Sequence, residues 1–435
     1  MQKKCLKRLY VIILLLIFPF YNVACTKDQT TSINQNTPKK TIAFRITWKS
    51  YSGRGEAIQK IVNLYNEQNN KTCKITLLSG DEDLAAIEMM LENQSQIIYM
   101  LPYRYVQHFG GLGYLADMSD SFAKESSIFY PQLFRLGQVN GSTYGIPWLG
   151  HSICLVYNQD LLSKAGVDVS SINSLDSWVE AMKQVEARTD ARGVGLVGAN
   201  HNDVSWMVNQ FIYGYGSSLV DDSGTKVTVN NEKSKQALDF YKNTLGAHAQ
   251  AGWVDHSGTE VMECFRKQQI AFEFQGPWGV SDIAQNGNPF KMGVIPLEDI
   301  GLYAEVGPMM LSLPKNMSDA DKDAAMDFIR FLISKPAQEK IMDGEYSPEH
   351  DAYYPFRVPV RKDLADSLVF KKYPQYIPFL QGFKCPSVDV PVPHWQTVKD
   401  KYYAPGLHQV MKSEISIDDF LAMIEAKGNE TLLTR

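Results

Sequence analysis

The sequence predicts an α/β protein with two domains, and three observations lead to this expectation. Short apolar stretches of strand character alternate with amphipathic helical stretches, which is typical of sheets covered by helices. A second set of such units begins close to residue 150. The chain has 435 residues, whereas a single hydrophobic core stops growing near roughly 250–300 residues.

The first βα units begin at the alternating apolar residues 42–48, which predict a strand. A helix is expected after the turn at 52–55, then a strand over 74–78, a helix over 83–92 and a strand over 96–101. This order predicts a parallel sheet with helices on both faces, in which ligands lie beyond the carboxyl ends of the strands. The candidate ligand-binding residues at those ends are Trp48, Tyr51, Asp81, Glu82, Tyr103 and Arg104.

The middle of the chain predicts a turn, a short buried strand and a capped helix. Residues 153–157 are too few for a helix and rich in strand formers. Asn158 or Asp160 suits the start of the following helix, and Gly166 suits the left-handed position that ends it. Trp148 stands between a proline and this strand, as expected where a chain crosses a cleft. A half-buried tryptophan in an ordinary loop is the alternative.

The βα pattern then repeats. A helix is predicted over 176–187 and strands over 194–197, 226–229 and 270–274. The polar and aromatic residues that follow these strands are Asn200, His201, Trp206 and Trp278. A further strand is expected within 307–314, and the tail ends in helices near 395–411 and 417–426.

The first 40 residues differ from the rest of the chain. Four basic residues precede an unbroken apolar run over 9–18, which predicts an export signal over 1–24, because the run is too short for a membrane span. The sequence before Cys25 resembles a bacterial lipobox, in which the cysteine is lipidated, although Asn22 replaces the usual aliphatic residue. The polar residues 25–40 predict a flexible tether.

Charge and cysteine content exclude several classes of function. The formal net charge is −5 and becomes more negative when the basic signal is removed, so neither nucleic acid nor an anionic membrane surface is an expected partner. Export permits disulfides, but the spacing of the later cysteines selects no pairing and matches no zinc site. Neither a metal nor a cofactor is predicted. These cysteines are Cys73, Cys154, Cys264 and Cys385.

No nucleophile elbow, P-loop or paired-histidine zinc helix occurs in the sequence. Glu273 and Asp282 form a carboxylate pair of the kind that a glycoside hydrolase needs, with a separation that the sequence does not show. Aromatic residues in loops after strands are the stronger signal, because sugar CH faces pack on such rings while the hydroxyls need polar partners. These rings are Trp48, Tyr103, Trp148, Trp206, Trp278 and Trp395.

Six motifs in a consistent order resemble one family, the extracellular solute-binding protein family 1, which comprises sugar-capturing lipoproteins of bacterial ABC importers. Each motif alone is loose, but the ordered set covers nearly the whole mature chain. The motifs are 141–148, which ends in Gly-Ile-Pro-Trp, with 155–160; 173–178; Phe265 through Gly-Pro-Trp at 276–278; 310–314 with 327–332 and 336–338; 359–363; and 417–421.

The resemblance implies a type II periplasmic-binding-protein-like fold, in which two α/β lobes are joined at a hinge and hold the ligand in a cleft. It implies an N-terminal lobe of residues 41–149 plus 307–345 and a C-terminal lobe of residues 150–306 plus 346–435. The hinge residues that it implies are Ile146, Pro147, Gly307 and Pro308.

Trp278 aligns with the family's Gly-Pro-Trp ring, which stacks on sugar, and is the strongest single candidate. Trp395 resembles another stacking position in the C-terminal segment, and Tyr354 is a candidate from the aromatic tail. Arg45 and Arg104 favour a charged or modified sugar over a simple maltose-like ligand.

These observations predict a monomeric, lipid-anchored receptor outside the cytoplasm, without catalytic activity or cofactor, that passes a sugar to an ABC permease. An oligosaccharide is favoured, and contact with the membrane is expected through the lipid on Cys25. Two alternatives stay open. One is a secreted carbohydrate-active hydrolase. The other is the same fold binding a peptide, a polyamine or a metal chelate.

Overall fold

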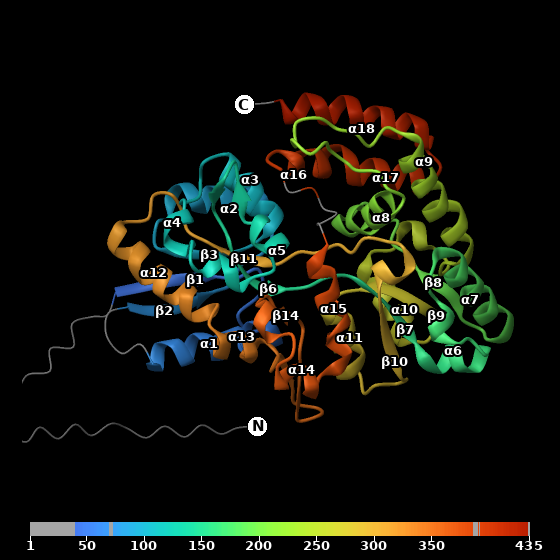
Figure 1. The fold of residues 1–435 in the computed structure, drawn as a ribbon, viewed down its shortest axis with the longest axis horizontal. Helices are drawn as coiled ribbons and strands as arrows, with labels where there is room; N and C mark the ends of the chain where they lie inside the picture. The colour runs from blue at the N-terminus through green and yellow to red at the C-terminus, as the bar shows by residue number, and fades with distance from the viewer. Residues whose placement is uncertain (1–39, 69–72, 386–389, 391, 434–435) are drawn as a thin grey trace, which may run out of the picture. The chain divides into compact units, whose positions relative to one another are not determined.

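The computed structural model describes residues 40–68, 73–385, 390 and 392–433. The predicted export signal, the tether and Cys25 lie outside these residues. Two mixed β-sheets, each covered by helices, organise the described chain (Figure 1). Within this part of the chain, no helix combines the length and apolar character needed to cross a bilayer.

The first sheet has six strands in the order β14-β6-β11-β3-β1-β2. β1 pairs in parallel with β2 and β3, as predicted. β11 is antiparallel to both β3 and β6, and β14 is antiparallel to β6, so the prediction of a parallel sheet is wrong for this half. The strands are β1 (Lys40–Arg45), β2 (Cys73–Leu78), β3 (Ile97–Pro102), β6 (Ile146–Gly150), β11 (Met309–Ser312) and β14 (Val358–Pro359).

Helices cover this sheet through apolar faces. α1 packs against β2, α12 and α13, while α3 packs against β3 and β11. α2 begins where the Asp83 carboxylate accepts a hydrogen bond from Ala86 N–H at 2.8 Å, as a helix cap requires. The helices are α1 (Gly53–Gln68), α2 (Leu84–Asn93), α3 (Tyr103–Gly111), α12 (Asp319–Leu332) and α13 (Lys335–Ile341).

The second sheet has four strands in the order β10-β7-β9-β8, and only β8 and β9 are parallel. The prediction of a strand over 226–229 is wrong, because only Val227 forms an isolated bridge, to Val220. The strands are β7 (Cys154–Asn158), β8 (Arg192–Gly195), β9 (Ile270–Gln275) and β10 (Met292–Pro296).

α6, α7, α10 and α11 pack against strands of the second sheet, and α8 packs against α9. Asn158 caps α6 through hydrogen bonds from Asp160 and Leu161 N–H, and Gly166 ends it at a φ of 71°, both as predicted. The helices are α6 (Gln159–Ala165), α7 (Leu175–Arg188), α8 (Asn202–Gly214), α9 (Glu232–Asp239), α10 (Gly258–Arg266) and α11 (Pro277–Gln285).

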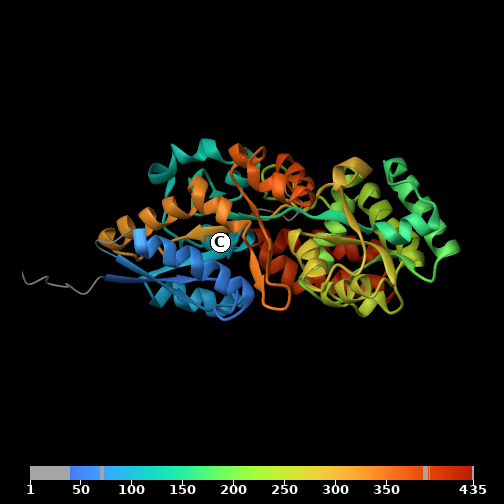
Figure 2. The ribbon, with the colours of Figure 1, turned by 90° about the horizontal axis from the view of Figure 1, so that it is seen from below.

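Two segments that connect the sheets run side by side. β6 and β11 pair antiparallel, and beyond these strands Ser152 bridges Val306. Ile153 N–H donates to Glu305 O at 2.9 Å, which continues the ladder to the start of β7. Residues 146–153 and 305–312 therefore form one continuous ribbon between the two sheets, which can be followed in Figures 1 and 2. We call it the crossing ribbon.

The tail contains a short hairpin and a set of helices. The predicted helices near 395–411 and 417–426 are confirmed, with a π-helical turn (Lys399–Tyr403) inside the first. Trp395 is buried beside Tyr403, with ring centroids 5.9 Å apart. The elements are β12 (Glu345–Ser347), β13 (Ala352–Tyr354), α14 (Leu368–Lys372), α15 (Pro378–Gln381), α16 (Trp395–Val398), α17 (Ala404–Met411) and α18 (Ile417–Leu432).

The four cysteines in the described residues are free thiols. Cys73 lies in β2, Cys154 in β7 and Cys264 in α10, while Cys385 follows α15. Burial raises the pKa of each thiol, so these side chains act as small apolar groups.

Trp148 lies in the core of the first sheet, so the expectation of a ligand contact is wrong. Its side chain is completely buried, and its ring centroid lies 5.3 Å from that of Phe44. The reason is that Pro147 and Trp148 belong to β6, where the register with β11 shifts by one residue. A proline lacks the N–H that a regular ladder needs, which explains the bulge.

We expect Trp148→Ala to lower the free energy of unfolding by about 3–5 kcal/mol, because it leaves a cavity beside Phe44. Urea denaturation followed by circular dichroism measures this change. Tyr51→Ala is the control, since that ring is 77% exposed and its removal should change the free energy by less than about 0.5 kcal/mol. Equal losses in the two variants would contradict the assignment of Trp148 to the core.

Candidate functional site

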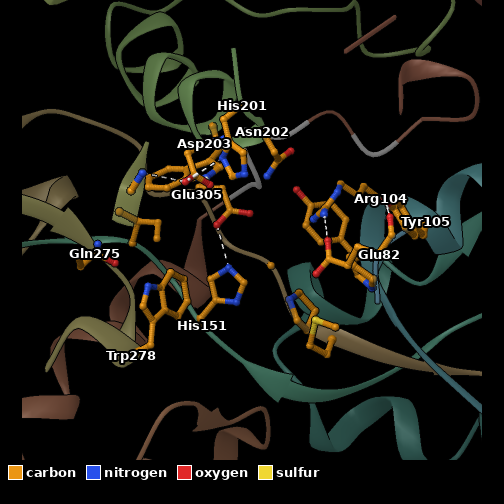
Figure 3. A pocket seen from close by; sticks show the side chains of 18 of the residues that line it. Glu82, Arg104, Tyr105, His151, His201, Asn202, Asp203, Gln275, Trp278 and Glu305 are labelled. Atoms are coloured by element: carbon orange, nitrogen blue, oxygen red, sulfur yellow. Dashed lines mark hydrogen bonds and ion pairs between the residues drawn. The ribbon is translucent and has the colours of Figure 1, made fainter. Parts of the chain in front are cut away.

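A cleft with a volume of about 620 Å³ opens between side chains of both sheets and the crossing ribbon. This volume lies within the range of small-molecule sites, roughly 300–1,000 Å³. Figure 3 shows Trp278 and His151 on one side of the cavity and Glu82, Arg104 and Tyr105 across from them. The polar and aromatic residues of the wall are Glu82, Tyr103, Arg104, Tyr105, His151, His201, Asn202, Asp203, Trp206, Thr259, Gln275, Trp278, Glu305, Arg357, Gln396 and Asp400.

Trp278 is held at the first turn of α11, directly after β9. Pro277 starts this helix, where its missing N–H has no cost. Gly276 allows the indole to fold back over the backbone, since a Cβ there would lie 2.2 Å from the ring. The half-buried indole meets the edge of the His151 ring, with centroids 5.1 Å apart. Its position is therefore determined by the turn as well as by its neighbours.

His151 and Glu305 face each other from the two segments of the crossing ribbon, with 3.0 Å between Nε2 and Oε2. Burial lowers the pKa of His151, and the attraction of Glu305 only partly opposes this, so the imidazole is neutral at pH 7. A neutral ring that donates from Nε2 presents Nδ1 as an acceptor. Gly307 keeps this region open, since a Cβ there would lie 2.8 Å from Glu305 and 2.9 Å from Tyr103.

His201 and Asp203 lie at the start of α8, after β8. The Asp203 carboxylate lies 3.1 Å from His201 Nδ1 and accepts hydrogen bonds from Trp206 Nε1 and Gly258 N–H, both at 3.1 Å. Burial acts to raise the pKa of Asp203, but these hydrogen bonds outweigh it and lower the pKa. The hydrogen bond with Asp203 raises the pKa of His201.

Glu82, Arg104 and Tyr105 form the opposite wall. Arg104 makes an ion pair with Glu82 and lies over the Tyr105 ring, 5.1 Å from its centroid. The Tyr105 hydroxyl donates to the Glu82 carbonyl at 2.6 Å, and burial raises the pKa of this tyrosine to about 12. The charge of Arg104 is therefore already matched within the protein.

Six predicted residues line the cleft together, namely Glu82, Tyr103, Arg104, His201, Trp206 and Trp278. Trp48 and Asp81 line a separate shallow pocket beside Arg54, where the Asp81 carboxylate also binds Arg45 at 3.1 Å. The prediction that they line the same wall as Trp278 is wrong in this structure. Trp48 still lies beside that wall, because the guanidinium carbon of Arg357 is 5.4 Å from its ring centroid.

The other predicted contacts also lie elsewhere. Tyr51 and Asn200 are exposed at turns and do not line the cleft. The Tyr354 hydroxyl is 3.1 Å from His350, at the β12–β13 hairpin. Trp395 packs with Tyr403 in the core, so it is not a stacking position here. Each of these side chains packs against its neighbours or lies at the surface.

Several wall residues were not predicted from the sequence. His151 and Glu305 lie a few residues from the predicted hinge positions, and Gln275 directly precedes the Gly-Pro-Trp motif, so their position along the chain was an available signal. Arg357 stands between apolar residues next to β14 and gave no such signal.

Glu273 and Asp282, the carboxylate pair considered for glycoside hydrolysis, do not line the cleft. Glu273 is buried within β9, and burial raises its pKa well above the usual range. Asp282 is held by Arg266, with 2.8 Å between the nitrogen and the carboxylate oxygen. This pair therefore has no access to a substrate in the cleft.

Comparison with known proteins identifies the class. Residues 60–378 match the family described as bacterial extracellular solute-binding protein, and the chain belongs to this family. A probable ABC transporter-binding protein of Deinococcus radiodurans is 27% identical over 54% of this chain and 58% of its own length. An arabinooligosaccharide-binding protein of Halalkalibacterium halodurans is 28% identical over 63% of this chain and 59% of its own length. The chain thus spans about three-fifths of the length of these curated relatives.

Among solved structures, maltose-bound MalE3 of T. maritima is 20% identical, with a TM-score of 0.76 over 90% of this chain and 100% of that one. The predicted fold class is confirmed: this is the two-lobe α/β fold of type II periplasmic binding proteins. At this level of identity the likeness extends to the fold alone.

The His201–Asp203 pair predicts a pH dependence. His201, with a usual pKa of 6.5, has a raised folded-state value, so its contribution to stability should be complete below pH 6.5 and lost as the pH rises through the raised value. At acidic pH, the contribution of Asp203 to stability should be lost as the pH falls below 3.8, the usual pKa of this carboxyl group, and through its lowered pKa in the folded state.

We expect Asp203→Asn to return the pKa of His201 toward its usual value, because the carboxylate that stabilises the imidazolium is gone. Titration of the ring protons by NMR measures this shift. Asp255→Asn serves as the control, since Asp255 contacts Lys412 and His408 instead. An unchanged His201 titration in Asp203→Asn would show that the pair is not formed in solution.

Proposed function

We propose that this protein is an extracytoplasmic receptor that captures a sugar, with an oligosaccharide favoured, and delivers it to an ABC importer. The observation that carries the proposal is the half-buried Trp278 ring in a cleft whose wall is otherwise mainly polar. A sugar presents apolar CH faces to such a ring and hydroxyls to its surroundings. One relative is named as a probable ABC transporter-binding protein and the other as an arabinooligosaccharide-binding protein, and both names support this proposal.

The cleft wall supplies polar atoms that suit hydroxyl groups. His151 Nδ1, Asn202 Oδ1 and Gln396 Oε1 are buried and have no hydrogen-bond partner within the residues that the structure describes. Each can accept a hydrogen bond, and a buried acceptor without a partner costs about 1–3 kcal/mol. A sugar hydroxyl that donates to such an atom would remove this cost. We therefore assign these three atoms to ligand recognition.

We propose that the crossing ribbon acts as the hinge, through Ile146 and Pro147 on one segment and Gly307 and Pro308 on the other. A ligand that bridges the two walls would favour a closed state by its greater affinity for that state. We propose that residues 41–149 plus 307–345 belong to the N-terminal lobe and residues 150–306 to the C-terminal lobe. Because β14 pairs with β6, we assign the return of the tail to the second lobe to a point after Pro359, later than residue 346.

We further propose that the solute is bound without chemical change, by a monomer anchored through a lipid on Cys25. Its family consists of binding proteins. In the cleft, Asp203 and Glu305 are held against His201 and His151, an arrangement that orders the wall. Release of product from oligosaccharides by the purified protein would favour the hydrolase alternative.

A thermal-shift screen over neutral and acidic mono- and oligosaccharides tests the proposed function. A ligand at about 100 times its dissociation constant adds roughly 2.7 kcal/mol of stability, enough for a visible shift. We expect at least one sugar to raise the melting temperature. If only peptides, polyamines or metal chelates do so, the sugar assignment is wrong.

We expect Trp278→Ala to weaken sugar binding by about tenfold or more, because a large apolar face is lost from the site. Isothermal titration calorimetry measures the affinity, and circular dichroism checks the fold. Trp253→Ala is a matched control, since that ring is also half-buried but packs on Tyr241 and does not line the cleft. Equal affinity in wild type and Trp278→Ala would remove Trp278 from the site.

We expect Cys25→Ala to release the protein from the membrane, because the predicted lipid attachment is lost. Fractionation of cells that express each form measures the distribution between membrane and soluble fractions. Cys385→Ala, which changes a cysteine far from the predicted signal, should leave the distribution unchanged. Persistence of Cys25→Ala in the membrane fraction would count against lipidation.

A further inference from the structure

Arg357 is the one arginine of the cleft wall without a carboxylate partner in the described part of the chain. Arg104, the other arginine there, is paired with Glu82. The Arg357 side chain is only 7% exposed. Burial, reinforced by the positive charge of Arg54, lowers its pKa to about 9, which leaves it charged at neutral pH. A buried charge normally requires a partner, so this cation needs an explanation.

The carboxylates that act to raise the pKa of Arg357 each have another partner. Glu82 binds Arg104, Glu305 binds His151, and Glu345 accepts a hydrogen bond from Arg54 at 2.9 Å. They act on Arg357 through the electrostatic field, without an ion pair. The positive charge of Arg357 is therefore not cancelled locally by a protein carboxylate.

Two tryptophan rings hold the guanidinium in place. Its central carbon lies over the Trp278 ring, 4.5 Å from the centroid, and 5.4 Å from the centroid of Trp48. These cation–π contacts offset part of the cost of burial and restrict the orientation of the group. They do not use its N–H donors, which point outward in the guanidinium plane.

The hydrogen bonds of Arg357 leave one edge of the guanidinium without an acceptor. Nη1 donates to the Phe356 carbonyl at 2.9 Å. Nε is buried and has no partner, and the bond from Nη1 is the one hydrogen bond that this side chain makes to a residue of the described ranges. Nε and Nη2 form one edge, which presents two parallel N–H donors. This edge matches the two oxygens of a carboxylate in a bidentate hydrogen-bonded pair.

We propose that Arg357 forms a carboxylate subsite in this cleft, so that the protein binds acidic sugars containing a uronic acid in preference to the corresponding neutral sugars. The inference rests on the proposed sugar-binding function and names the ligand class. The uronate carboxylate pairs with the Nε–Nη2 edge while the sugar ring lies near Trp278. Planarity favours a carboxylate over a tetrahedral sulfate ester, because both carboxylate oxygens lie in the plane of the guanidinium.

Isothermal titration calorimetry with matched sugars tests the subsite. The probes are oligomers of galacturonate against galactose and of glucuronate against glucose, two to four residues long, together with sulfated counterparts of the neutral sugars. For the wild-type protein we expect at least one uronate oligomer to bind about tenfold or more tightly than its neutral match, as for a hydrogen-bonded charge pair. This comparison needs no variant and is independent of folding defects.

Variants then assign the preference to one side chain. In Arg357→Gln the uronate and neutral affinities should become similar, and Arg357→Lys should recover only part of the preference, because a lysine lacks the planar fork. Arg135→Gln removes one positive charge from an exposed position outside the cleft and should keep the wild-type ratio. Each ratio is measured within one protein, so a general loss of stability does not mimic the effect.

The outcomes separate this inference from the proposed function. Binding of neutral sugars without any preference for uronates overturns the carboxylate subsite and leaves the sugar receptor intact. A preference for sulfated over carboxylated sugars also overturns it, as does a uronate preference that survives in Arg357→Gln. Absence of binding to every sugar, neutral or acidic, overturns both.

Discussion

The antiparallel pairing of the two segments of the crossing ribbon is the interaction on which the rest of the structure depends. β6 and β11 lie inside the first sheet, and the same ladder continues through Ser152 and Val306 to the start of β7 in the second. Because backbone hydrogen bonds need close approach, this ladder determines which residues meet at the cleft. His151 and Glu305 face each other only because their segments are paired, and Gly307 leaves the space that they occupy.

Two ion pairs keep the cleft wall ordered without making it apolar. Glu82 with Arg104 and Asp203 with His201 each join residues that are close in sequence or in neighbouring loops. Such pairs contribute little to stability where they are partly exposed. These pairs instead hold each side chain in one orientation, so that the donors and acceptors of the cleft are in place before a ligand binds. The buried cation of Arg357 makes no such ion pair within the described residues.

The sequence predicted the alternation of strands and helices, the caps of α6 and the helices of the tail, because these depend on local periodicity and on turn residues. It was less successful with individual tryptophans. Pro147-Trp148 and Pro277-Trp278 are the same dipeptide, yet the first ring is buried in a sheet and the second faces the cleft. The difference lies in the element that follows. A strand inside a sheet buries both faces, whereas the first turn of a helix leaves one side open.

Fold and ligand choice depend on separate sets of residues in this protein. The fold relies on buried contacts such as Phe44 with Trp148 and with Phe328, which any sequence of suitable apolar pattern can provide. This tolerance explains how a chain with 20% identity keeps a TM-score of 0.76. The cleft instead uses side chains at the ends of strands and at the starts of helices, where substitution hardly disturbs the core. A shared fold therefore does not determine the ligand, and the ligand class depends on the side chains that line the cleft.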